Sequence, residues 1–329
     1  MRRKFRKILV TGGAGFIGSA FVRLAVKKGI LPVIVDKLTY AGDLARLKEV
    51  ECKYKFYKVD ICDKPRLEAV FAKEKPDAVI HFAAESHVDR SIKDASPFIE
   101  ANIRGTQILL DTALKNKIKK FVHISTDEVY GDIEKGKFSE ESPLKPNSPY
   151  AASKAAADLL VKSYVRTFKF PALIIRASNN YGPWQYPEKF IPRAILTVLK
   201  NKKIPVYGKG LNVREWLYVE DCALGIWQVL KRGKIGEVYN LGSGYEEKNI
   251  QIAKKVLSIM QKCWVGIEFV KDRPGHDIRY SLSVQKILKQ AGWRAQTNLD
   301  AGLNKTVNWC IKNKQWLFGK WEEINKLYK

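Results

Sequence analysis

The chain has 329 residues, of which 46% are hydrophobic, and this composition is typical of a globular protein with one large domain or two smaller ones. No apolar run approaches the roughly 18 residues that a membrane span needs, so we expect no transmembrane helix. The 59 basic and 34 acidic residues give a net charge of +25, which invites a polyanion partner. Because these cations are spread over the whole length, a lysine-rich surface explains them better, and it would also favour a small phosphorylated substrate.

Cysteine and histidine spacing argues against a disulfide framework and against a metal site. The five cysteines lie far apart without a C-x-x-C pair, and the four histidines show no ligand spacing. We expect a reducing, cytoplasmic environment and no metal. The basic residues 1–7 and the apolar run after them look like the first half of a signal peptide, but glycines interrupt that run from Gly12 onwards.

The first expected elements are a strand over 8–10, a glycine-rich turn over 11–18 and a helix over 19–28. Gly12, Gly15 and Gly18 satisfy G-x-x-G-x-x-G, which permits a tight turn and a close approach of a pyrophosphate to backbone N–H groups. A second strand over 32–35 ends in Asp36, placed to accept from the adenine ribose and to repel a 2′-phosphate. The pattern predicts a dinucleotide site and favours NAD over NADP.

The same alternation continues and predicts an α/β fold with a doubly wound parallel (Rossmann) sheet. Strands are expected over 55–59, 78–84 and 121–126, and helices over 65–74, 99–115 and 151–166. Asp60, after the first of these strands, is placed to meet adenine, and His81 in the second is expected to be a core histidine.

After residue 178 the alternation degrades, which predicts a smaller α/β substrate domain interleaved with returns to the sheet. A helix is expected over 191–199, and strands over 204–208, 214–219 and 237–241. The predicted division assigns residues 1–178 and 214–243 to the NAD-binding domain, and residues 179–213 and 244–329 to the substrate-binding domain.

Two adjacent carboxylates, Asp127 and Glu128, follow the strand over 121–126. In an open α/β sheet, ligands bind at the carboxyl ends of the strands. Adjacent carboxylates repel, which tends to keep one of them protonated near neutrality and makes an acid–base pair. A solvated loop with a helix cap is the simpler interpretation of any single Asp-Glu pair, so a second feature has to favour catalysis.

That second feature is Tyr150-x-x-x-Lys154, at the start of an alanine-rich helix. Residues four apart share one helix face, and a cationic lysine beside a tyrosine favours the phenolate and brings a pKa of ~10 into working range. Tyr-x-x-x-Lys alone also fits an ordinary helix face. After a strand that ends in Ser125-Thr126 it indicates a catalytic base.

Polar residues in the second half of the chain are candidates for holding a diphosphate. Arg214 precedes an aromatic strand and suits bidentate binding of a phosphate. Each candidate alone is more simply a surface residue, whereas together they supply the cations that a diphosphate needs. The candidates are Asn179, Lys189, Arg214, Asn249, Arg273 and His276. Ser86 and His87, at the end of the strand over 78–84, suit either a substrate contact or a plain loop.

The segment 309–329 mixes three tryptophans with lysines. Such interleaving can stack nucleic acid bases, but packing of an amphipathic terminal helix explains it more simply. An NAD-sensing protein that binds nucleic acid through its basic surface stays open as an alternative of another class. Intact catalytic residues argue against it, and we expect neither a nucleic acid nor a membrane partner.

Taken together, the glycine-rich turn over 11–18, Thr126 and Tyr150-x-x-x-Lys154 resemble the extended short-chain dehydrogenase/reductase family. Within that family the acid pair after Thr126 is similar to that of the dehydratases acting on dTDP-glucose, since the epimerases lack the pair. Further stretches extend the similarity over nearly the whole chain, namely 36–42, 83–91, 126–131, 179–183, 187–192 and 273–280.

The resemblance implies an NAD-dependent lyase that converts dTDP-glucose to dTDP-4-keto-6-deoxyglucose and water, a step of dTDP-rhamnose biosynthesis. Tyr150 would take the C4 hydroxyl proton while hydride passes to NAD, with Lys154 in support. Glu128 would remove the C5 proton, Asp127 would protonate the departing C6 hydroxyl, and hydride would return to C6. The alternatives are a nucleotide-sugar 4-epimerase and the same dehydratase acting on UDP- or CDP-glucose.

The resemblance also implies the residues of the site. The catalytic set is Thr126, Asp127, Glu128, Tyr150 and Lys154. The cofactor-binding set is Gly12, Gly15, Phe16, Ile17, Gly18, Asp36, Lys37, Leu38, Thr39, Asp60, Ile61, Phe82, Ala83, Ala84, Ser86, Tyr150, Lys154 and Asn180. The substrate-binding set is Ser86, His87, Thr126, Asn179, Lys189, Phe190, Pro205, Val206, Tyr207, Arg214, Asn249, Arg273 and His276.

A homodimer is expected as well. The predicted helices over 99–115 and 151–166 carry apolar residues on more than one face, whereas a surface helix needs a single apolar stripe. The resemblance implies that these helices pair across a two-fold axis. Deep burial within one chain is the alternative. The apolar residues include Ile103, Ile108, Leu109, Leu159, Leu160 and Val161.

Overall fold

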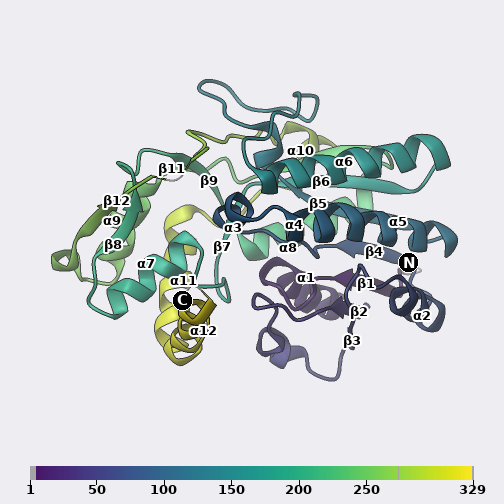
Figure 1. Ribbon diagram of the computed structural model, residues 1–329, viewed down its shortest axis with the longest axis horizontal. Coiled ribbons are helices and arrows are strands. Elements are labelled where there is room, and N and C mark those ends of the chain that lie inside the picture. The colour runs from purple at the N-terminus through teal and green to yellow at the C-terminus, as the bar shows by residue number, and fades with distance from the viewer. Residues whose placement is uncertain (1–4, 273, 328–329) are drawn as a thin grey trace.

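The computed structural model describes residues 5–272 and 274–327, with side chains described as far as residue 323. Seven parallel strands form the main sheet, with helices on both of its faces (Figure 1). In spatial order they are β10 (Val238–Leu241), β6 (Ala172–Ala177), β5 (Lys120–Thr126), β4 (Ala78–His81), β1 (Lys7–Thr11), β2 (Leu31–Asp36) and β3 (Lys55–Lys58). The predicted doubly wound parallel sheet is confirmed.

Strand composition explains why both faces of this sheet are covered. In β1, Ile8 and Val10 point into one core and Leu9 into the other. Strands that are apolar on both faces require helices on each side. One core is closed by α1 (Phe16–Lys27), α8 (Val219–Arg232) and α10 (Gln285–Ala291), and the other by α2 (Lys64–Glu74), α5 (Gly105–Lys115) and α6 (Pro149–Phe168).

The order of the strands determines where a ligand can enter. From β1 the chain passes to β2 and β3 on one side, and then returns to β4, β5 and β6 on the other. The reversal falls between β1 and β4, which pair in parallel from Ile8 with Ala78 to Thr11 with His81. At such a reversal the two connections diverge and leave a crevice beyond the carboxyl ends of the strands.

Two smaller sheets and a third core make up the rest of the molecule. The three-stranded sheet contains β7 (Asn179–Tyr181), β9 (Val213–Tyr218) and β11 (Glu246–Lys248), and the two-stranded sheet contains β8 (Ile204–Tyr207) and β12 (Ile267–Val270). Around them pack α7 (Phe190–Leu199), α9 (Asn249–Ile259), α11 (Leu299–Lys312) and α12 (Lys314–Leu327). Within the segment 214–243, β9 lies in the three-stranded sheet, while α8 and β10 belong to the main sheet. The division into two domains stays a prediction.

Most expected elements are confirmed with bounds shifted by one to three residues, and two differ more clearly from the structure. The strand predicted over 78–84 ends at His81, because its neighbour β1 ends at Thr11 and the chain then turns at Gly12 with a φ of +67°. The helix predicted over 99–115 starts with the short α4 (Ser96–Phe98) and a wide π turn, η2 (Ile99–Arg104), before α5. The remaining short elements are α3 (Val88–Lys93), η1 (Leu44–Val50), η3 (Asp127–Tyr130) and η4 (Cys263–Val265).

His81 is a core histidine, as predicted. Its ring lies within hydrogen-bonding distance of the Thr11 and Thr106 hydroxyls, at 2.7 and 2.9 Å, and burial lowers its pKa to about 3, so it is neutral at physiological pH. Within residues 5–272 and 274–327, no helix has the length and apolar character that crossing a membrane requires.

Candidate active site

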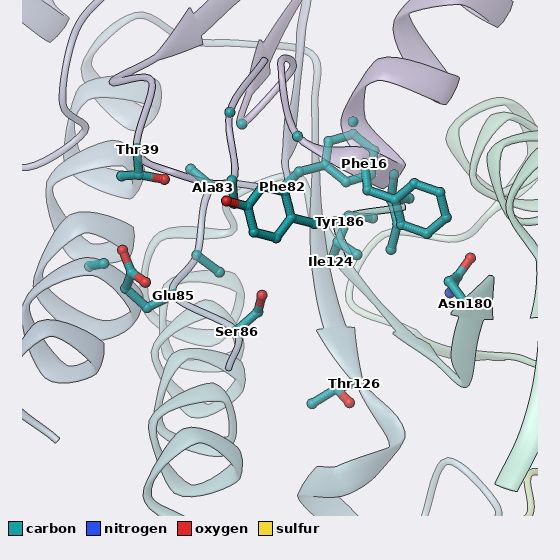
Figure 2. A pocket seen from close by; sticks show the side chains of 18 of the residues that line it. Phe16, Thr39, Phe82, Ala83, Glu85, Ser86, Ile124, Thr126, Asn180 and Tyr186 are labelled. Atoms are coloured by element: carbon teal, nitrogen blue, oxygen red, sulfur yellow. The ribbon is translucent and has the colours of Figure 1, made fainter. Parts of the chain in front are cut away.

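A cavity of about 330 Å³ lies at the carboxyl ends of β1, β2, β4 and β5, where the sheet reverses. Figure 2 shows Thr126 at the end of β5 and Asn180 on β7 around the same cavity as Phe16 and Ser86. Residues of the main sheet and of the three-stranded sheet therefore line one cavity. This is the position expected for a ligand site in an open parallel sheet.

The floor of the cavity is the glycine-rich turn between β1 and α1. A Cβ on Gly12 would lie 2.6 Å from the Ala83 nitrogen, and one on Gly18 would lie 2.2 Å from the Gly12 oxygen. No other residue fits at these two positions without moving the backbone. The turn also precedes the first N–H groups of α1, which carry partial positive charge. The space above the glycine-rich turn, called the glycine cradle below, and the positive N–H groups of α1 fit the pyrophosphate of a dinucleotide.

The acid at the end of β2 holds this turn in place. Asp36 accepts hydrogen bonds from the Ala14 N–H at 3.0 Å and the Leu38 N–H at 2.8 Å, and it lines the cavity. Burial raises its pKa, and these two N–H groups oppose the rise. The Lys37 ammonium is paired with Asp60 at 3.3 Å. Because this pair engages the ammonium, Lys37 is less available to bind a 2′-phosphate.

The acid pair follows β5 directly. Thr126 caps the turn η3 by accepting from the Glu128 N–H at 3.3 Å, and its hydroxyl donates to Asp127 at 3.2 Å. Asp127 is 1% exposed. Burial raises the pKa of this carboxyl well above its ordinary value, and the charges of Glu128 and Glu215 raise it further. Burial, with the predicted repulsion within the pair adding to it, therefore shifts Asp127 toward its protonated form.

Tyr150 and Lys154 enter the cavity from the first turns of α6. Ser148 caps this helix by accepting from the Ala151 N–H at 3.1 Å, and Pro149 occupies the first position. Both side chains are buried, at 8% and 4% exposure. The ammonium of Lys154 donates to the Ile124 carbonyl at 2.7 Å, and burial lowers its pKa to about 8.

The expectation that Lys154 lowers the pKa of Tyr150 is wrong for the protein groups alone. Burial raises the pKa of Tyr150 well above its ordinary value, and the Glu128 carboxylate adds to the rise. The hydrogen bond with Thr126 acts in the opposite direction but does not offset them. Sequence spacing could not reveal this, because desolvation depends on what covers the hydroxyl and not on its neighbour along the helix.

The residues predicted for the cofactor converge on the cavity with one exception. Leu38 is not among the described residues that line it, and its backbone, at a φ of +55°, serves Asp36 instead. Those that do line it are Gly12, Gly15, Phe16, Ile17, Gly18, Asp36, Lys37, Thr39, Asp60, Ile61, Phe82, Ala83, Ala84, Ser86, Tyr150, Lys154 and Asn180.

The residues predicted for the substrate divide into two groups. Ser86, Thr126, Asn179 and Lys189 line the cavity, and Lys189 donates to the Ser86 carbonyl at 2.9 Å. The other described members lie outside that lining, namely His87, Phe190, Pro205, Val206, Tyr207, Arg214, Asn249 and His276. Arg273 lies outside the residues that the structure describes.

Several of the outer group still contact one another. The rings of Tyr207 and His276 meet edge to face, with centroids 6.0 Å apart. The guanidinium of Arg214 lies 4.5 Å from the centroid of the Tyr280 ring, and its Nη2 donates to the Asp277 carbonyl at 2.9 Å. Tyr207 and His276 thus lie together outside the cavity, whereas Arg214 is buried with its guanidinium held by protein groups.

The cavity-lining side chains that sequence reasoning missed include Arg46, Tyr186 and Glu188. Glu188 accepts from the Tyr40 hydroxyl at 3.1 Å and lies 3.7 Å from His87 Nε2. It therefore connects the segment after β2 with the segment after β4. Burial raises its pKa. Glu188 stands in one of the stretches that carry the resemblance, and that stretch was the available signal. Nothing in the pattern around Arg46 marks it as a site residue.

Comparison with known proteins identifies the class. The family model described as GDP-mannose 4,6 dehydratase matches residues 9–306, and the chain belongs to this family.

Individual relatives show which enzymes within this family the chain is similar to in sequence and structure. The chain is 45% identical to a probable dTDP-glucose 4,6-dehydratase of Sinorhizobium fredii, over 98% of this chain and 97% of the relative. It is 46% identical to the dTDP-glucose 4,6-dehydratase of Neisseria meningitidis serogroup B, over 97% and 96%. The crystal structure of a Streptomyces venezuelae dTDP-glucose 4,6-dehydratase with NAD and TYD bound superposes with a TM-score of 0.93 at 44% identity, over 95% of this chain and 99% of that one. The resemblance to dTDP-glucose 4,6-dehydratases is confirmed.

Asp127→Asn should stabilise the folded chain increasingly as the pH rises. The folded protein holds the Asp127 proton to a higher pH than the unfolded chain does, so above the ordinary aspartate pKa unfolding releases a proton and stability falls with pH. Asparagine has no proton to lose. The difference in unfolding free energy between variant and parent should grow by up to about 1.4 kcal/mol per pH unit.

Urea denaturation of both proteins between about pH 4 and about pH 7 measures this difference. Asp300→Asn, at a carboxylate that is 71% exposed on α11, is the control. A difference for Asp127→Asn that stays flat with pH would show that the carboxyl ionises at its ordinary pKa in the folded protein.

Proposed function

We propose that this chain is an NAD-dependent lyase that converts dTDP-glucose to dTDP-4-keto-6-deoxyglucose and water. The observation that carries the proposal is the buried Asp127, whose raised pKa favours the protonated form, beside Glu128 in the cavity that also holds Tyr150 and Lys154. Elimination of water β to a ketone needs one acid and one base side by side, and these two carboxyls supply them. Relatives named dTDP-glucose 4,6-dehydratase support the same reading.

NAD, when bound in the glycine cradle, would take hydride from C4 of the sugar and return it to C6, so that the reaction consumes no cofactor. Tyr150 would remove the C4 hydroxyl proton. Its raised pKa makes its phenolate a strong base but a rare one, and positive charge from Lys154 is needed to form it. Thr126, whose hydrogen bond lowers the pKa of Tyr150, would orient the hydroxyl.

Once C4 is a ketone, the C5 proton becomes acidic and Glu128 would remove it, and Glu128 would return a proton to C5 when hydride reaches C6. Asp127 would then give its proton to the departing C6 hydroxyl. The two roles follow from the environments of the carboxyls, because Asp127 is fully buried and Glu128 is partly exposed to the cavity. An acid that keeps its proton at neutral pH and a base that loses it are the pair that this step needs.

The nucleotide half of the substrate would lie along the outer group of predicted residues. Arg214, Lys189 and His276 would face the diphosphate, and the ring of Tyr207 would pack beside the base. We also propose a cytoplasmic location, since all five cysteines are free, as expected in a reducing compartment.

The first expected outcome is loss of water from dTDP-glucose on incubation with the protein, detected by mass spectrometry. UDP- and CDP-glucose in the same assay test the nucleotide preference, and the protein should turn over dTDP-glucose fastest. A product of unchanged mass would instead indicate a 4-epimerase. Absence of turnover together with tight, salt-resistant binding of nucleic acid would favour the nucleic-acid-binding alternative.

The second expected outcome separates the two half-reactions. Glu128→Gln keeps the shape and removes the base, so it should oxidise C4 but stall before elimination, with a loss of about 10²–10⁴-fold in dehydration. Tyr150→Phe should block C4 oxidation itself. With enzyme in excess, borohydride trapping of the C4 ketone and deuterium incorporation at C5 distinguish the two variants. Full C5 exchange at the parental rate in Glu128→Gln would show that Glu128 is not the base.

We propose further that the chain forms a homodimer through α5, α6 and η2. Of the residues predicted to be apolar on a second face, Ile108, Leu109 and Val161 are buried within the chain, which fits the alternative for those three. Leu159, Ile99 and Phe168 are instead 58%, 54% and 53% exposed. Leu159 lies on α6 and Ile99 on η2, and these two elements pack against each other. Half-exposed apolar side chains on neighbouring helices are typical of an interface between copies.

Leu159→Lys should therefore convert the dimer to a monomer at micromolar concentration, because it places a charge in the apolar interface. Light scattering on a sizing column measures the mass. Ile235→Lys is the matched control, since Ile235 is 54% exposed but lies beyond α8, and it should leave the dimer intact. A monomeric parent chain would contradict the proposal.

A further inference from the structure

An arginine lies buried beneath the glycine-rich turn. Arg46, in η1, is 1% exposed and lines the cavity. Its Nη1 donates to the Ala14 carbonyl at 2.9 Å and to the Ala41 carbonyl at 2.6 Å. Asp36 accepts from the Ala14 N–H, so the two peptide units that flank Ala14 are each held by a buried charged group. Arg46 therefore helps to set the orientation of the turn on which a pyrophosphate would lie.

Helix α12, near the C-terminal end of the chain, contacts the start of η1, the element that carries Arg46. Asp43, which caps η1, accepts the indole N–H of Trp316 in α12 at 2.8 Å, a contact across 273 residues of sequence. Lys320, one turn further along α12, lies 3.4 Å from the same Asp43 oxygen. The Asp43 N–H donates to the Ala14 carbonyl at 3.0 Å, so α12 is two hydrogen bonds away from the glycine-rich turn.

A tryptophan cluster completes the connection. The rings of Trp184, Trp309 and Trp316 meet pairwise, with centroids 4.7 to 5.5 Å apart. Arg46 donates from Nε to the Trp184 carbonyl at 3.1 Å, and its guanidinium lies 5.6 Å from the centroid of the Trp316 ring. Trp184 has a φ of +71°, a strained value for a bulky residue, which indicates that the cluster dictates its conformation.

The charges at this junction suit a bound anion. Burial lowers the pKa of Arg46 to about 10, with Asp43 and Asp36 opposing, so Arg46 stays cationic at neutral pH. Its Nη2 is buried and has no hydrogen-bond partner among the residues that the structure describes. A buried guanidinium left partly unpaired destabilises the fold, which argues that its position serves the cavity and not stability alone.

We propose that Arg46 is a positioning residue of the dinucleotide site and that α12, through Trp316 and Asp43, holds it there, so that the C-terminal helix slows dissociation of the bound cofactor. The inference rests on the proposed function, in which NAD is regenerated in every turnover. An enzyme that returns its cofactor to the starting state has no need to release it. The contact of α12 with Asp43, which in turn bonds the glycine-rich turn, is therefore compatible with turnover.

Trp316→Phe is the sharpest test, because it keeps an aromatic ring in the cluster and removes the N–H that Asp43 accepts. The purified holoprotein is loaded with radiolabelled NAD, diluted into excess unlabelled NAD without sugar nucleotide, and filtered over time. Release should be about tenfold faster than from the parent, the size expected for one hydrogen bond to a charged group. Trp309→Phe alters the same cluster without contacting Asp43 and should release NAD at the parental rate.

Arg46→Lys keeps the charge, loses the forked hydrogen bonds and should release NAD faster still. Thermal midpoints of the apoproteins report any general loss of stability separately from the release rate. Parental release from both Trp316→Phe and Arg46→Lys would overturn the inference, as would equal acceleration in Trp309→Phe. A parent that binds no NAD would contradict this inference and the proposed cofactor together, whereas normal retention without dehydration would contradict the proposed function alone.

Discussion

The close approach of the β1–α1 turn to the chain after β4 is the constraint on which the rest of the structure depends. Gly12 passes so near the Ala83 backbone that a single methyl group would separate them. This contact ends the pairing of β1 with β4, opens the crevice at the reversal of the sheet and brings the 82–86 segment across it. The cavity is thus a consequence of backbone packing, and the chemically active side chains are arranged around its rim.

Desolvation determines what those side chains can do. The same burial that raises the pKa of Asp127 raises that of Tyr150 and lowers that of Lys154, so each group is shifted toward its neutral form. A neutral carboxyl is a useful acid, whereas a neutral tyrosine still has to be ionised. Ionisation of Tyr150 therefore depends on the positive charge that Lys154 retains. The N–H groups at the start of α1 and the guanidinium of Arg46 suit an anionic ligand.

Contacts between distant segments tie the two halves of the cavity together. Glu188 joins Tyr40, Arg90 and His87, which come from elements of the main sheet, to the start of α7. Asp43 makes the corresponding link to α12 through the Trp316 indole. Both acids are shielded from water, and a charged hydrogen bond in such surroundings holds its partners more firmly than it would on the surface.

Local patterns in the sequence determined the alternation of strands and helices, the glycine-rich turn, Asp36 and the candidate catalytic residues at the end of β5 and the start of α6. Periodicity, glycine geometry and residue spacing are properties of short segments, and a short segment carries them wherever it is placed. Tertiary structure alone decided that Arg46 and Tyr186 line the cavity and that the pKa of Tyr150 rises. Burial and long-range hydrogen bonds depend on which distant segments meet, and no pattern within one segment records that.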